Sequence, residues 1–285
     1  MLQRLLRELA KQQTAGEFTF SIVVTNNDAA QSARPIVENF WKNFPPPASI
    51  PVVYAVQPER NIALARNTAL DNAQGDFIAF IDDDEFPEAG WLLNLFRVCQ
   101  SNRVAGVLGP VKPFFERQPP SWLLKAGFYQ RPTHPTGHLV PWQECRTGNV
   151  LFRRNILDPY EPAFRREFGT GGEDQDFFRR MIEKGHRFIW CDEAVAFEEV
   201  PPARWTRRFM INRALLRGKN TLRHRQKRAR NLLKSAVAVP AYACALPFLL
   251  VAGHHHFMRY VVKLADHFGR LLAFARLNPV SHRRS

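Results

Sequence analysis

The sequence predicts an α/β fold in which a mostly parallel sheet is flanked by helices and is followed by a separate C-terminal helical segment. Three observations lead to this fold class. Apolar, β-branched runs alternate with helical stretches, four consecutive acids end one of these runs, and charge and hydropathy change near residue 200. With 285 residues, the chain is long enough for one large α/β domain and an appendage.

The elements of the first part follow from the pattern of apolar residues. Residues 1–13 are predicted to form an amphipathic helix; charges occur throughout it, so it is not a signal peptide. Residues 61–73 are predicted to form a helix that crosses between two strands, and residues 110–141, rich in Pro and aromatics, a loop or helical excursion. The predicted strands are residues 18–25, 52–56, 77–81, 104–111, 150–152 and 188–190.

Basic charge is confined to the C-terminal part of the chain. Residues 1–199 contain 22 Lys and Arg against 25 Asp and Glu, whereas residues 200–285 contain 18 against 1. A basic run at 203–234 precedes an uncharged stretch at 236–252, which fits an anionic membrane surface better than nucleic acid. We therefore predict two parts, residues 1–202 and a basic and apolar helical membrane-associating region at residues 203–285, with no nucleic-acid partner.

The apolar stretch leaves two membrane arrangements open. As a helix, residues 236–252 would be about 26 Å long, shorter than a hydrocarbon core of about 30 Å, and Pro240 and Pro247 are expected to interrupt it. Residues 257–277 place charged and apolar side chains largely on different helical faces. This pattern is typical of an interfacial helix or of the second arm of a re-entrant hairpin.

Four consecutive carboxylates, Asp82 to Glu85, follow the predicted strand at residues 77–81. In extended backbone Asp82 and Asp84 point to one side and Asp83 to the other. Ligands gather at the carboxyl ends of strands in open α/β sheets, and carboxylates this close repel one another unless a cation compensates. We therefore predict a hard divalent ion with oxygen ligands here; the alternative is a solvated acidic turn that caps the next helix.

A second group of acids follows two glycines at residues 171 and 172. Asp174 and the apolar residues Phe177, Phe178 and Met181 recur at helical spacing, which places Asp174 at a helix N-terminus, on the face turned toward the protein. There the helix dipole favours a carboxylate, which can accept a proton from a hydroxyl group. The alternative is an acid that only caps the helix.

Together these motifs resemble family 2 glycosyltransferases, particularly those that build bacterial exopolysaccharides of the succinoglycan type. The resemblance covers roughly residues 1–225, and it implies a GT-A, Rossmann-like fold. It is carried by the sequences NIALARNTALDNAQ at residues 61–74, GDFIAFIDDDEFPEAGWL at residues 75–92 and GGEDQDFFRR at residues 171–180.

The resemblance also implies a role for each predicted site residue. Asp174 is the general base, Asp82 contacts the ribose of the nucleotide, and Asp84 together with Asp82 binds Mg²⁺ or Mn²⁺. The residues implied for the nucleotide sugar are Asn26, Asp28, Arg66, Asp82 and Asp83. The residues implied for the donor sugar and the acceptor are Thr147, Gly148, Asn149 and Glu173, although the loop that carries the first three is equally compatible with an ordinary turn.

The sequence departs from the family pattern in two places. Family members begin with a strand and a base-holding loop, whereas residues 1–10 already look like the helix that follows, so we expect an N-terminally truncated domain without the first strand. Asn26 stands where the family commonly has Asp, although Asp28 remains. Residues 213–220 lack the Gln-x-x-Arg-Trp motif of processive relatives, which predicts transfer of a single sugar.

The predicted function is inverting, metal-dependent transfer of a sugar from a nucleotide-sugar donor to a lipid-linked saccharide acceptor in bacterial polysaccharide biosynthesis. The protein is expected at the cytoplasmic face of the bacterial inner membrane, as a peripheral or monotopic protein. Two alternatives remain open. One is a catalytically weak or inactive GT-A-like membrane protein or scaffold, and the other is a nucleotidyltransferase, for which the sequence offers no Gly-rich or Lys-bearing phosphate loop.

Overall fold

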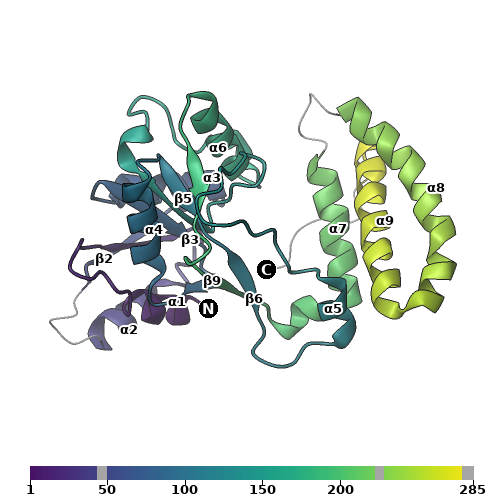
Figure 1. The fold of residues 1–285 in the computed structure, drawn as a ribbon, viewed down its shortest axis with the longest axis horizontal. Helices are drawn as coiled ribbons and strands as arrows, with labels where there is room; N and C mark the ends of the chain where they lie inside the picture. The colour runs from purple at the N-terminus through teal and green to yellow at the C-terminus, as the bar shows by residue number, and fades with distance from the viewer. Residues whose placement is uncertain (44–49, 222–227, 278–285) are drawn as a thin grey trace. The chain divides into compact units, whose positions relative to one another are not determined.

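The computed structural model describes residues 1–43, 50–221 and 228–277. The chain divides into two compact units (Figure 1): unit 1 contains residues 1–114 and 131–199, and unit 2 contains the described residues of 115–130 and 200–285. The boundary at residue 199 lies three residues before the division expected from the sequence, and unit 2 also takes in residues 115–130. Residues 222–227 of the predicted basic run and residues 278–285 of the predicted membrane region lie outside the described residues.

Unit 1 combines strands and helices, which confirms the predicted α/β class. Its described strands form three sheets, with the orders β1-β2, β3-β7-β5-β8 and β4-β9-β6. The strands are β1 (Ile22–Asn26), β2 (Val52–Val56), β3 (Phe77–Ile81), β4 (Glu85–Pro87), β5 (Gly106–Leu108), β6 (Val111–Phe114), β7 (Asn149–Arg153), β8 (Phe188–Trp190) and β9 (Ala196–Glu199). The helices are α1 (Leu2–Leu9), α2 (Arg34–Asn43), α3 (Ile62–Asn72), α4 (Trp91–Ser101) and α6 (Glu173–Glu183).

The strand pairing is mixed, whereas the sequence predicted a mostly parallel sheet. Among the described strands, β1–β2, β5–β8 and β6–β9 are parallel, and β3–β7, β5–β7 and β4–β9 are antiparallel. Strand β7 causes the reversal in the largest sheet, because it runs antiparallel between β3 and β5. Nearly all of β7 is buried, as β5 is, so hydropathy does not distinguish the directions of these two strands.

Several strand boundaries differ from the prediction. Strand β1 begins at Ile22 rather than at residue 18, and the predicted strand at residues 104–111 divides into β5 and β6. The division occurs at Gly109 and Pro110, where Pro110 has no N–H for a strand ladder and a Cβ on Gly109 would lie 2.3 Å from the Ala194 carbonyl oxygen. Strands β4 and β9 were not predicted, because their sequences, EFP and AFEE, mix apolar residues with acids and form no apolar run.

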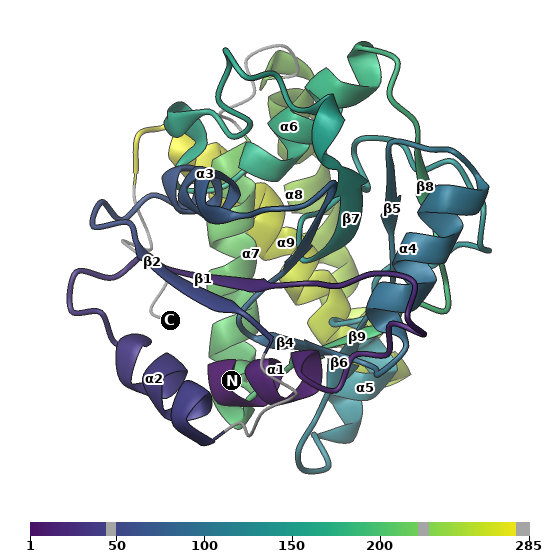
Figure 2. The same cartoon turned by 90° about the vertical axis from the view of Figure 1, so that its left-hand side faces the viewer.

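Two apolar clusters form the core of unit 1. Helix α4 contributes Trp91 and Leu95 to the first cluster, and α6 contributes Phe177 and Phe178 to the second. Helix α3 packs on β1 and β2, and α2 lies on the other side of this strand pair (Figure 2). This packing holds α3, which carries Arg66, and α6, which carries Glu173 and Asp174.

Unit 2 is helical in its described part, with α5 (Ser121–Ala126), α7 (Arg207–Thr221), α8 (Arg228–Ala252) and α9 (His254–Phe274). Pro240 and Pro247 lie inside α8, so the predicted interruption is wrong. Each proline removes only one backbone donor, and the helix continues on both sides of it. The segment Asn231–Ala252 is long and apolar enough to cross a membrane, by length and composition alone.

Helix α9 forms a hairpin with α8 and also packs against α7 (Figure 1). Gly253, with φ of +129°, makes the turn of the hairpin. Asp266 of α9 is buried, where its Oδ1 lies 2.8 Å from Arg217 Nε, and it also pairs with Arg270. Part of the predicted charged face of residues 257–277 is therefore turned toward α7, and the two membrane arrangements that the sequence left open remain predictions.

Candidate active site

The acids after β3 form a turn that leads directly into β4. The Glu85 N–H donates to the Asp82 carbonyl oxygen at 3.0 Å and closes this turn. Asp83 is exposed and Asp82 and Asp84 are half-buried, although the backbone here turns and is not extended as the sequence prediction assumed. Burial raises the pKa of Asp82, the Arg66 guanidinium lowers it, and the neighbouring carboxylates raise it. Because 47% of the Asp82 side chain is exposed, solvent screens part of this repulsion.

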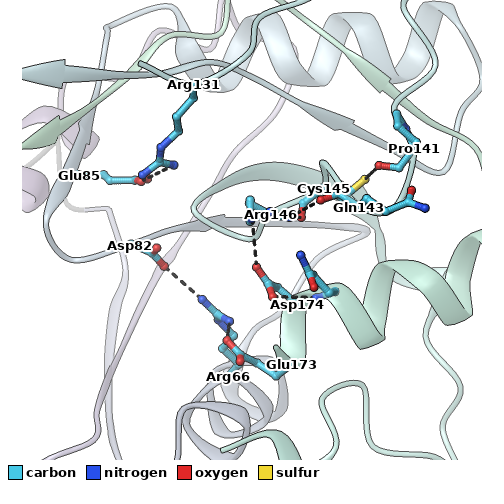
Figure 3. Close-up of polar contacts among 11 residues, drawn as sticks. Arg66, Asp82, Glu85, Arg131, Pro141, Gln143, Cys145, Arg146, Glu173 and Asp174 are labelled. Atoms are coloured by element: carbon cyan, nitrogen blue, oxygen red, sulfur yellow. Dashed lines mark hydrogen bonds and ion pairs between the residues drawn. The ribbon is translucent and has the colours of Figure 1, made fainter. Parts of the chain in front are cut away.

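Arg66 on α3 connects these acids to helix α6 (Figure 3). Its Nη2 lies 3.3 Å from Asp82 Oδ1, and its Nη1 pairs with Glu173 Oε1. The side chains of Arg66 and Glu173 are only 12% and 4% exposed, so their ion pair is largely buried. Asn61 caps α3 by accepting two N–H groups of the first turn, at 3.0 and 3.1 Å. The two acidic motifs, far apart in the sequence, therefore meet at one guanidinium group.

Helix α6 begins after two glycines that have left-handed backbone. Gly171 and Gly172 have φ of +123° and +95°, a region that favours glycine. Asp176 in the first turn is buried, and its Oδ2 lies 2.9 Å from Arg180 Nε. Asp176 is therefore a structural acid that anchors the helix start.

Asp174 lies beside the loop at residues 146–149. Its side chain is 18% exposed, and its Oδ2 lies 4.0 Å from Arg146 Nε (Figure 3). Burial raises the pKa of the neighbouring Glu173, Arg66 lowers it and Asp174 raises it. The other two acids in the first turn of α6, Glu173 and Asp176, are buried and pair with Arg66 and Arg180. Asp174 is more exposed, and its ion pair with Arg146 is longer.

Gly148 brings the loop into contact with the acids after β3. A Cβ at this position would lie 2.9 and 3.0 Å from the two carboxylate oxygens of Glu85 and 3.1 Å from Asp82 Oδ2. Any side chain here would therefore require the loop or these carboxylates to shift. The preceding residue, Thr147, is 1% exposed, and its Oγ1 has no hydrogen-bond partner among the described residues.

The side chain of Asn149 is occupied by protein partners. Its Nδ2 donates to the carbonyl oxygens of Pro110 and Ala194, each at 2.9 Å, and its Oδ1 accepts from Trp91 Nε1 at 2.7 Å. These bonds tie the start of β7 to α4 and to the segments before β6 and β9. This side chain therefore has a packing role. Its predicted contact with a sugar remains a prediction.

Asn26 is the last residue of β1 and Asp28 follows the strand, and both have local partners. Asn26 is buried and donates from Nδ2 to the Asp28 carbonyl oxygen at 2.5 Å. The Asp28 carboxylate accepts the N–H groups of Ala30 and Ser32 at 2.9 and 3.2 Å, and these hydrogen bonds lower its pKa. The end of β1 is joined to the start of α3, because the Asn61 N–H donates to Asn27 Oδ1 at 3.0 Å. The nucleotide contacts of Asn26 and Asp28 remain predictions.

Two residues at the site were missed in the sequence. Glu85 is 2% exposed, and Arg131 Nη1 lies 3.8 Å from its Oε1 (Figure 3). Burial raises the pKa of Glu85 well above its ordinary value, Asp82 raises it further and Arg131 lowers it. Glu85 could have been found, because it is the fourth acid of the run after β3. Arg131, in a Pro-rich stretch, gave no signal.

The acids after β3 fit a divalent cation that also binds a diphosphate. Within the described part of the chain, no group of three His, Cys, Asp or Glu side chains is arranged to hold a metal ion. Mg²⁺ and Mn²⁺ sites in nucleotide enzymes use one or two carboxylates and complete their shell with phosphate oxygens and water. Asp82 and Asp84 supply two such carboxylates, and their mutual repulsion favours a cation between them.

Known proteins resemble this chain in sequence and in fold. Residues 1–160 match the model of glycosyl transferase family 2. The succinoglycan biosynthesis protein ExoM of Rhizobium meliloti (strain 1021) is 34% identical over 221 residues, which cover 76% of this chain and 69% of that protein. The hyaluronan synthase of Pasteurella multocida is 23% identical over 231 residues, which cover 69% of this chain and 23% of that protein.

A solved structure of S. aureus TarS, residues 1–349 in complex with UDP, superimposes with a TM-score of 0.54 at 17% identity. The match covers 98% of this chain and 89% of that chain. The fold and the two acidic groups thus define an enzyme of the GT-A glycosyltransferase class.

The chain belongs to glycosyl transferase family 2, because the family model covers more than half of it and ExoM matches over most of both sequences. The predicted family, the GT-A fold and the assignment as a glycosyltransferase are confirmed. Family membership also removes the nucleotidyltransferase alternative.

Proposed function

We propose that this enzyme transfers a sugar from a nucleotide-sugar donor to a lipid-linked saccharide, with inversion at the anomeric carbon and with Mg²⁺ or Mn²⁺. The similarity to ExoM, a succinoglycan biosynthesis protein, supports a role in bacterial exopolysaccharide synthesis. The observation that carries the proposal is the bridge made by Arg66, which pairs with Asp82 after β3 and with Glu173 beside Asp174.

Asp174 is the general base of the proposed reaction. It takes the proton from the acceptor hydroxyl as the hydroxyl oxygen attacks the anomeric carbon. The new carbon–oxygen bond forms on the face opposite the leaving phosphate, and the bond to the phosphate oxygen breaks with its electron pair on the nucleoside diphosphate. A single displacement of this kind inverts the anomeric carbon, and Arg146, 4.0 Å from Asp174, orients the base.

The acids after β3 hold the donor. Asp84 and Asp82 bind the cation, which when present stabilises the negative charge of the departing diphosphate. Arg66 and Asp83 add contacts to the nucleotide sugar, and Asn26 and Asp28 extend the nucleotide site along the end of β1. The complexes of TarS with UDP and with UDP-GlcNAc make these two compounds the first choices for donor and product assays.

Unit 2 attaches the enzyme to the cytoplasmic face of the bacterial inner membrane. Only 6% of the apolar window of Asn231–Ala252 is buried, and Leu233, Val237, Phe248 and Val251 are exposed. Exposed apolar side chains on one helix, next to a basic segment, suit a bilayer with anionic lipids. A membrane location also suits an acceptor carried on a lipid.

Transfer assays with the full chain in detergent or vesicles test the proposal. Wild-type enzyme, a panel of nucleotide sugars and a lipid-linked saccharide are expected to give nucleoside diphosphate and extended saccharide with Mn²⁺, and neither with excess EDTA. Asp174→Asn is expected to lower kcat by about 10²–10⁴-fold while donor affinity, measured by calorimetry, stays unchanged.

Glu183→Gln, at the exposed far end of α6, is the matched control and is expected to behave as wild type. Full turnover by Asp174→Asn would remove the assignment of the base. Failure of the wild type to turn over any donor would favour the alternative of an inactive membrane protein.

A further inference from the structure

Glu85 is a charged residue at a position that suits an apolar one. All three residues of β4 are buried, and Glu85 lies directly opposite Glu198 across the β4–β9 pair. Burial of a carboxylate opposite another carboxylate is unfavourable unless a cation compensates. Packing alone does not account for Glu85, and such a break in the local pattern is typical of functional sites.

Arg131 compensates the two glutamates unequally. Its Nη2 pairs closely with Glu198, whereas its Nη1 lies 3.8 Å from Glu85 Oε1. The other oxygen of Glu85, Oε2, is buried and has no hydrogen-bond partner in the described part of the chain. Arg131 therefore makes only a long ion pair with Glu85, whereas its contact with Glu198 is close.

Both oxygens of the Glu85 carboxylate face Gly148. A Cβ on Gly148 would lie 2.9 Å from Glu85 Oε1 and 3.0 Å from Glu85 Oε2, and the same Cβ would lie 3.1 Å from Asp82 Oδ2. The loop therefore rests on two carboxylates, and the length of Glu85 decides how closely it approaches the acids after β3. Thr147, the residue before Gly148, is buried, and its hydroxyl has no hydrogen-bond partner among the described residues.

We propose that Glu85 is a positioning residue for the transfer reaction: held by Arg131, it supports the turn at residues 147 and 148 and sets the geometry of the acceptor site. The inference rests on the proposed function and on the resemblance, which implies that residues 147–149 serve the donor sugar and the acceptor. Glu85 does not touch the reacting atoms, so it acts through the loop. Its length is what the site requires.

Steady-state kinetics on the full chain test the inference with two variants that alter the contact between Glu85 and Gly148. Glu85→Asp withdraws the carboxylate from the loop, and Gly148→Ala pushes the loop away from it. Each is expected to raise the KM of the lipid-linked saccharide at least about tenfold, since displacements near 1 Å have large effects on bound geometry. Donor affinity, measured by calorimetry with Mn²⁺ and UDP-GlcNAc or whichever nucleotide sugar the wild type uses, is expected to stay within about twofold.

Two further variants separate positioning from folding. Glu85→Gln keeps the length of the side chain and is expected to keep a near-normal acceptor KM. The double variant Glu85→Asp with Gly148→Ala is expected to have an acceptor KM closer to wild type than either single variant, because the shorter side chain makes room for the new Cβ. Glu198→Gln is the matched control, since it alters the other partner of Arg131 without touching the loop, and it is expected to leave the acceptor KM unchanged.

An unchanged acceptor KM in both single variants would overturn the inference. A donor affinity that falls as much as the acceptor KM rises would also overturn it. So would variants that differ from wild type only in the amount of folded protein. Absence of transfer by the wild type contradicts the proposed function itself. Transfer with an unchanged acceptor KM contradicts only the role of Glu85.

Discussion

The ion pair between Arg66 and Glu173 gives a stability prediction with a definite pH dependence. Arg66→Met keeps most of the side-chain volume but leaves the Glu173 carboxylate, 4% exposed, without its cation. Removal of one partner from a buried pair costs about 3–5 kcal/mol. The second partner, Asp82, is 47% exposed and adds at most about 1 kcal/mol. The unfolding free energy is therefore expected to fall by about 3–5 kcal/mol near pH 7.5.

The cost is expected to shrink in acid. Burial already raises the pKa of Glu173 in the folded protein and Arg66 lowers it, so loss of Arg66 raises this pKa further. An acid whose folded pKa exceeds its unfolded value destabilises the fold increasingly as pH rises through that interval, and has no such effect below the ordinary value of 4.5. Near pH 4 only the lost hydrogen bond remains, at about 1 kcal/mol.

Urea unfolding followed by tryptophan fluorescence, at about pH 4 and about pH 7.5, measures both values. The double variant Arg66→Met with Glu173→Gln is expected to regain most of the loss at the higher pH, because it buries no charge. Arg97→Met removes an exposed pair with Glu17 and is expected to leave the unfolding free energy nearly unchanged at either pH. An equal cost of Arg66→Met at both pH values, or no recovery in the double variant, would refute the reasoning.

Three other predictions concern the remaining parts of the molecule. Asn149→Ala removes three buried hydrogen bonds and is expected to lower the unfolding free energy by about 2–4 kcal/mol, measured by urea unfolding; a cost below about 0.5 kcal/mol would contradict its packing role. Asp84→Asn is expected to weaken Mn²⁺ binding in the presence of UDP at least about tenfold by calorimetry, and equal affinity would remove it from the cation site. Val251→Glu, on a side chain 90% exposed in α8, is expected to reduce cosedimentation with anionic vesicles while transfer to a water-soluble acceptor persists; unchanged cosedimentation would place the membrane contact elsewhere.

Much of the fold was predictable where a strand is a run of apolar residues or a helix has apolar residues at helical spacing. Residues 52–56, 77–81 and 188–190 are strands β2, β3 and β8 as expected, and α3 lies within the predicted helix at residues 61–73. The direction of β7 was not predictable, because a strand buried on both faces reads alike in parallel and antiparallel sheets. The course of α8 through Pro240 was missed for a different reason, since proline weakens a helix locally without fixing its end.

The site was predictable as two acidic motifs but not as a set of contacts. The run after β3 and the acids at the start of α6 were each visible in the sequence, and each had a plain structural alternative. The bridge by Arg66, and the contact of Gly148 with two carboxylates, depend on how α3, α6 and the loop before β7 pack. Sequence spacing contains no information on such packing, which is why Arg131 was missed and why Glu85, although part of the acidic run, was given no role of its own.

Anomalous diffraction from crystals of the enzyme with Mn²⁺ and an unreactive donor analogue tests most directly whether both acidic groups serve one anomeric carbon. The expected result is a manganese peak beside the Asp84 carboxylate, bridged to the diphosphate, with the anomeric carbon facing Asp174. Manganese bound away from the turn after β3, or a donor whose anomeric carbon points away from α6, would contradict a shared transfer site.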